Sequence, residues 1–113
     1  MQVFNFRILP WSGGQDARRL ERLQRLLDEI GTEISTEKDT LGDQYENATT
    51  NAAFAFEAME NGEGPEWTSR KIDALTASVT RYSQRLRSLK HEADFIEATK
   101  QRVALLLGAR DRL

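Results

Sequence analysis

The sequence contains no cysteine, a single histidine and only two prolines among its 113 residues. Without cysteine there is no disulfide scaffold, no cysteine-based zinc site and no thiol nucleophile, and an intracellular protein is the simpler interpretation. No run of about 18 apolar residues occurs, so we expect no transmembrane segment. The first ten residues carry one positive charge, at Arg7, and their apolar run is too short and interrupted for a signal peptide. These absences predict a cytoplasmic protein.

Neither sign of charge is in large excess. The chain has 16 Lys and Arg against 18 Asp and Glu, a formal net charge of -2. Such a balance gives no general attraction for nucleic acid, which is therefore not the expected partner.

Four segments divide the chain into what we expect to be one all-α domain. Residues 1–14 are rich in β-branched and aromatic side chains and close on Gly13 and Gly14, which predicts a short extended arm. Residues 15–60 and 66–112 contain no proline and repeat apolar positions at helical spacing. Residues 61–65, Asn-Gly-Glu-Gly-Pro, predict a turn, and Pro65 suits the first turn of the next helix.

Both predicted helices carry a heptad repeat. In residues 66–112 the repeat consists of Ile72, Val79, Leu86, Ala93, Lys100 and Leu107, with Leu75, Tyr82, Leu89, Ile96 and Val103 three residues later. In residues 15–60 it consists of Leu20, Leu27, Ile34, Leu41, Ala48 and Ala55, with Leu23 and Ile30 three residues after their partners and Glu37 also at a seam position. Beyond Leu41 the companions shift to Tyr45, Ala52 and Met59. A period of 3.5 residues is typical of a coiled-coil seam.

The two seams fit each other when the chain folds back at the turn. If the numbers of facing residues add up to about 127, Ile34 faces Ala93 and Ala55 faces Ile72, and small residues meet large ones along most of the seam. We therefore predict a long antiparallel helical hairpin of the coiled-coil type. Gly42 and the threonines of residues 35–51 lower helix propensity, so a kink near residues 39–43, or a full break giving three helices, is the alternative.

Several large apolar residues fall outside the seam, and a two-helix hairpin offers them no cover. We expect them to form an oligomer interface, most simply in a dimeric four-helix bundle. The predicted interface comprises Phe4, Phe6, Ile8 and Trp11 of the arm with Leu26, Phe54, Phe56, Phe95 and Leu106 of the helices. The arm could instead pair with a partner protein or pack on its own hairpin.

Charge is segregated between the helices. Residues 15–60 carry 5 basic and 11 acidic side chains, a net charge of -6, whereas residues 66–113 carry 10 basic and 6 acidic, a net charge of +4. Antiparallel packing would gather a candidate basic patch at the open end of the hairpin. Its members are Arg18, Arg19, Arg22, Arg25, Arg102, Arg110 and Arg112.

The sequence offers little for catalysis. His91 is the only imidazole and is expected on the outward face, and the residue three positions before it is Ser88 rather than a glutamate. Phosphate-binding and nucleophile motifs are missing, so we expect no catalytic residue, metal site or cofactor. The predicted function is a non-enzymatic, homo-oligomeric structural, adaptor or chaperone-like module that binds another protein. The alternative is a subunit that binds nucleic acid or an anionic membrane surface through the basic end.

Overall fold

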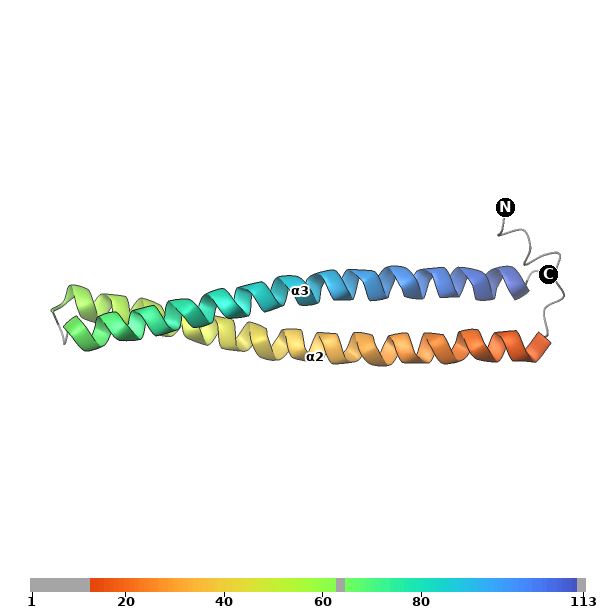
Figure 1. Ribbon diagram of the computed structural model, residues 1–113, viewed down its shortest axis with the longest axis horizontal. Helices are drawn as coiled ribbons and strands as arrows, with labels where there is room; N and C mark the ends of the chain where they lie inside the picture. Colours follow the sequence, from red (N-terminus) through yellow and green to blue (C-terminus); the bar gives the residue numbers. More distant parts are fainter. Residues whose placement is uncertain (1–12, 63–64, 112–113) are drawn as a thin grey trace. The chain divides into compact units, whose positions relative to one another are not determined.

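The computed structural model describes residues 13–62 and 65–111, and within them the chain forms two long α-helices (Figure 1). The first, α2, spans Gly13–Glu60 and has 48 residues; the second, α3, spans Pro65–Asp111 and has 47. Gly13 and Gly14, which the sequence placed in the arm, belong to α2. Asp16 lies in the first turn of α2, where a carboxylate stabilises the exposed N–H groups.

A glycine cap ends α2. The Asn61 N–H donates to the Glu57 carbonyl at 3.1 Å, and the Gly62 N–H donates to the Met59 carbonyl at 3.0 Å. Gly62 has a φ of 79°, a left-handed conformation that glycine adopts without steric cost. The predicted all-α helical hairpin is confirmed, whereas its assembly into a four-helix bundle remains a proposal.

The weak stretch of α2 remains helical through Gly42, so the three-helix alternative is wrong. Two of its threonines direct their hydroxyls to the backbone of the preceding turn: Thr40 Oγ1 donates to the Thr36 carbonyl at 3.2 Å, and Thr49 Oγ1 donates to the Tyr45 carbonyl at 2.8 Å. These two hydroxyls are satisfied within the helix, although such bonds to the preceding turn slightly destabilise it.

The helices contribute to two compact units. The open-end unit holds the described residues up to Glu33 and from Ala93 onward, and the turn unit holds those from Ile34 to Glu92. In the open-end unit the buried residues are Ala17, Leu27, Ile96 and Val103. A Cβ placed on Gly31 would lie 3.7 Å from Ile96 Cγ2. Because the numbers of these two residues add up to about 127, α2 and α3 pack here in the predicted register.

The turn unit has a similar thin core. Its buried residues are Ile34, Ala48, Ala55 and Leu89. Leu89, with 1% of its surface exposed, is the one side chain in the described part of the chain that is almost completely enclosed. All buried residues of both units except Ala17 belong to the predicted seams, so the heptad pattern identified the core. Neither helix, over its described residues, combines the length and hydropathy needed to cross a membrane.

Candidate interaction surface

Large apolar side chains are exposed on both units, as expected for residues outside the seam. The most exposed are Leu105 at 69%, Phe95 at 68% and Phe54 at 65%, followed by Phe56 and Leu26. Leu106 is partly exposed. Phe4, Phe6, Ile8 and Trp11 lie outside the described residues. The role of this whole set in an oligomer interface stays a prediction.

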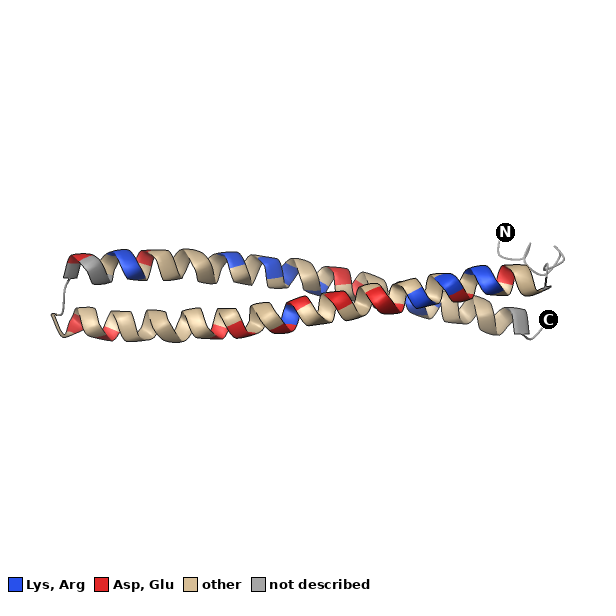
Figure 2. Ribbon diagram, turned by 90° about the horizontal axis from the view of Figure 1, so that it is seen from below, with Lys and Arg blue, Asp and Glu red and all other residues tan. Residues whose placement is uncertain are grey.

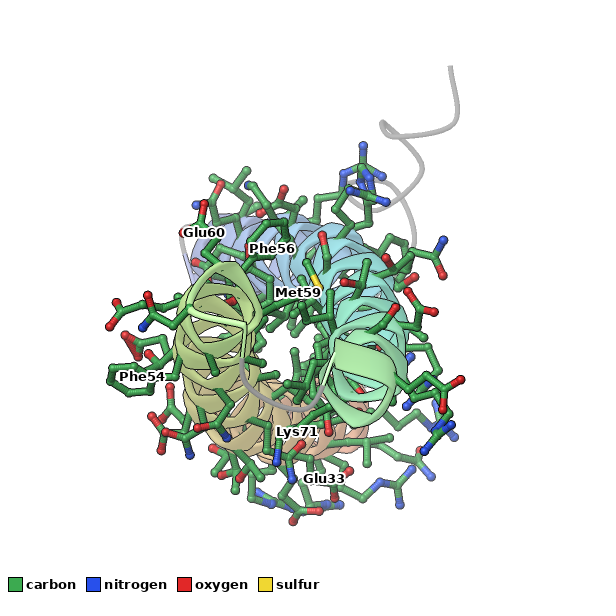
Figure 3. All side chains as sticks on the ribbon, turned by 90° about the vertical axis from the view of Figure 1, so that its left-hand side faces the viewer. Glu33, Phe54, Phe56, Met59, Glu60 and Lys71 are labelled. Carbon is green, nitrogen blue, oxygen red and sulfur yellow. The ribbon has the colours of Figure 1, made fainter. Side chains whose placement is uncertain are left out.

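The two exposed phenylalanines of the turn unit occupy different sides of α2. Figure 3 shows Phe54 pointing away from α3 and Phe56 on another side of α2. Two residues along a helix correspond to a rotation of about 200°, so Phe54 and Phe56 do not form one continuous surface, although they are close in sequence.

In the open-end unit, by contrast, three predicted interface residues share one side of the helix pair. Leu26 immediately precedes the buried Leu27, Phe95 precedes the buried Ile96, and Leu106 precedes the half-buried Leu107. Each residue is rotated by about 100° about the helix axis from the one before it. In an antiparallel pair, the residue that immediately precedes a seam residue therefore lies on the same side of the plane through the two axes in both helices. Leu26, Phe95 and Leu106 consequently lie on one side, which we call the apolar side.

The opposite side of the same unit is polar. Asp28 follows Leu27, and its carboxylate lies 3.1 Å from the Lys100 ammonium, with Glu97 3.8 Å from the same nitrogen. The hydrogen bond to Asp28, reinforced by the charges of Asp28 and Glu97, raises the pKa of Lys100. Lys100, a charged residue at a seam position, thus turns its ammonium away from the apolar side.

Charges along the apolar side of α2 follow a definite order. Arg19 and Arg22 precede Leu26, and Glu29 and Glu33 follow it, at spacings of three and four residues that keep all five on one stripe of the helix. We call these five residues the α2 stripe. Figure 2 shows the same change from basic to acidic along the early part of α2. The net charge of α2 does not reveal this order, which becomes visible when the heptad spacing is started at Arg19.

The predicted basic patch is only partly assembled among the described side chains. Arg18, Arg19, Arg22 and Arg25 line an open depression on α2 together with Gln15 and Glu21. Arg102 is exposed on α3 in the same unit. The side chain of Arg110 and all of Arg112 lie outside the described residues.

In the turn unit, Arg85 of α3 forms one ion pair with α2 and another within its own helix. Arg85 donates two hydrogen bonds to the Glu37 carboxylate, at 2.8 and 3.1 Å, and lies 3.7 Å from Glu92. The hydrogen bond from Arg85 lowers the pKa of Glu37, and the same bond raises the pKa of Arg85. Glu37, a polar residue at a seam position, therefore has a partner on the facing helix.

The described residues include no group of three or more metal-binding side chains. His91 is exposed on α3. Comparison with protein-family models, curated proteins and solved structures finds no match to this chain.

Proposed function

We propose that this protein is a non-enzymatic, homo-oligomeric helical hairpin that serves as a structural, adaptor or chaperone-like protein–protein interaction module in the cytoplasm. The observation that carries the proposal is the exposure of Phe54 and Phe95, each about two-thirds open to solvent on helices whose seam is already filled. Full burial of one such side chain is worth about 1.5–3 kcal/mol. Two hairpins packed as a four-helix bundle are the simplest assembly that supplies this burial.

The test is the molar mass of the full chain across a concentration series, measured by sedimentation velocity and light scattering. We expect a dimer that weakens when Phe95 is replaced by Ser. Ala98→Ser is a matched control, because it changes an exposed residue of the same helix without removing a large apolar surface. A wild-type chain that remains monomeric throughout would contradict homo-oligomerisation.

A second candidate function follows from the arginine-lined depression on α2. Arg18 and Arg25 point outward there beside Arg19 and Arg22, an arrangement suited to phosphate groups of nucleic acid or of an anionic membrane surface. Under this alternative, binding to anionic vesicles or to duplex DNA falls steeply with salt and is reduced by replacing Arg18, Arg19 and Arg22 with Ala. Binding that is unaffected by salt or by these replacements would exclude it.

A further inference from the structure

We propose that the α2 stripe is the contact by which a second copy of this chain binds, with the two α2 helices antiparallel about a two-fold axis near Leu26. This inference rests on the homo-oligomeric part of the proposed function and specifies its surface. The occupant is indicated by the order of charge along the helix.

The stripe is complementary to itself when reversed. Arg19 lies seven residues before Leu26 and Glu33 lies seven after it, while Arg22 lies four before and Glu29 three after. If Leu26 meets Leu26 of an antiparallel second copy, Arg19 comes opposite Glu33 and Arg22 comes beside Glu29. A two-fold axis repeats each of these pairs, so the contact contains four attractive pairs. A parallel contact would instead place like charges together.

The apolar content of this side supports the same contact. Leu26 is 49% exposed at the centre of the stripe, and Leu23, a seam residue, remains 40% exposed beside it. Phe95 and Leu106 lie on the same side of α3. A hydrophobic centre flanked by complementary charges is the usual anatomy of a specific interface.

The charges of the stripe are also largely uncommitted. Within the described part of the chain, no ion pair involves Arg22, Glu29 or Glu33, and Arg19 has only an exposed contact with Asp16 at 3.2 Å. Pairing across the axis would therefore break no interhelical contact within the hairpin.

Charge reversal tests the contact on the full-length chain. One variant carries Arg19→Glu with Arg22→Glu and the other carries Glu29→Arg with Glu33→Arg. Each alone should raise the dimer dissociation constant in sedimentation velocity by at least about tenfold, because every pair across the axis becomes repulsive. Mixing the two variants should restore a heterodimer, since all pairs become attractive again. A variant that had merely lost its fold would show no such rescue.

Arg18→Glu with Arg25→Glu is the matched control. It changes the net charge of α2 by the same amount as the Arg19→Glu, Arg22→Glu variant, at positions that face away from α3 and lie outside the stripe. It should leave the dissociation constant within about threefold of wild type. Circular dichroism checks that each variant keeps the helicity of the wild type. If the arginine reversal lowers the helicity, Arg19→Gln with Arg22→Gln takes its place and should give a smaller rise in the dissociation constant.

The outcomes separate this inference from the function on which it rests. A wild-type dimer that both reversals leave intact, or a mixture that forms no heterodimer, overturns the antiparallel α2 contact and leaves homo-oligomerisation standing. A monomeric wild-type chain overturns both.

Discussion

At the scale of single residues, three glycines differ in what a methyl group would meet. A Cβ on Gly31 would make an ordinary contact with Ile96, a Cβ on Gly42 would meet open space, and Gly62 has a positive φ. We expect Gly42→Ala to stabilise the fold by about 1 kcal/mol through helix propensity and Gly31→Ala by at least as much. Gly62→Ala should cost roughly 1–2 kcal/mol. Thermal unfolding followed by circular dichroism checks the order, and a destabilised Gly31→Ala would contradict the packing described.

The Glu37–Arg85 pair makes stability depend on acid pH. Because the pKa of Glu37 is lowered in the folded state, its contribution is fully present above the ordinary carboxyl pKa of about 4.3. That contribution is lost as the pH falls through the lower folded pKa. We expect Glu37→Gln to flatten the acid limb of the stability curve in urea unfolding from pH 6 to pH 2. Glu46→Gln, an exposed change on the same helix, is the control; an equal effect of both would contradict a specific pair.

At the scale of whole helices, α2 is continuous but unevenly stabilised. Residues 35–51 contain Gly42 and many threonines, and their seam includes the small Ala48. We expect their amides to exchange with deuterium faster than those of residues 86–103, where Leu89, Ile96 and Val103 are buried. Gly42→Ala should slow exchange in residues 35–51 and leave residues 86–103 unchanged. A uniform exchange rate along α2 would show that low helix propensity does not weaken residues 35–51.

The helices and their register could be predicted from sequence because the apolar seam repeats over many turns. A wrong register would misalign every pair of facing seam residues at once. The partners of polar seam residues could not be predicted. Arg85 and Glu37 are 48 positions apart, and their long side chains meet between layers rather than at facing positions. Lys100 likewise faces Leu27 in the seam but pairs with the neighbouring Asp28. The order of charge on the α2 stripe was present in the sequence, but the side of the hairpin on which the stripe lies was assigned from the burial of Leu27 and Ile96.

The start of α2 shows the limit of local signals. Gly13 and Gly14 resemble the end of a loop, yet they begin a helix, and Ala17 is buried although no predicted seam residue lies there. Glycine is one of the residues accepted at a helix start, whereas in a helix interior its backbone entropy makes it costly. A glycine pair therefore does not exclude a helix that begins at Gly13.

For the molecule as a whole, the α2 stripe and the predicted arm lead to different predictions for a dimer that lacks the arm. If the stripe forms the contact, a chain lacking residues 1–11 keeps the dimer, because all five residues of the stripe remain. We expect light scattering to give the same dimer for the full and the shortened chain at equal concentration. A shortened chain that is monomeric would instead make Phe4, Phe6 and Ile8 the assembly element.

Leu89 has a consequence for calorimetry. Since it alone among the described side chains is nearly enclosed, unfolding of a single hairpin exposes little new apolar surface to water. The increase in heat capacity on unfolding should then fall below the usual value of about 12–15 cal/mol/K per residue. A shallow heat-capacity step makes the stability curve flat, so an isolated hairpin would lose stability only slowly on cooling. Association would restore the missing step, and the curvature of stability with temperature would itself depend on protein concentration.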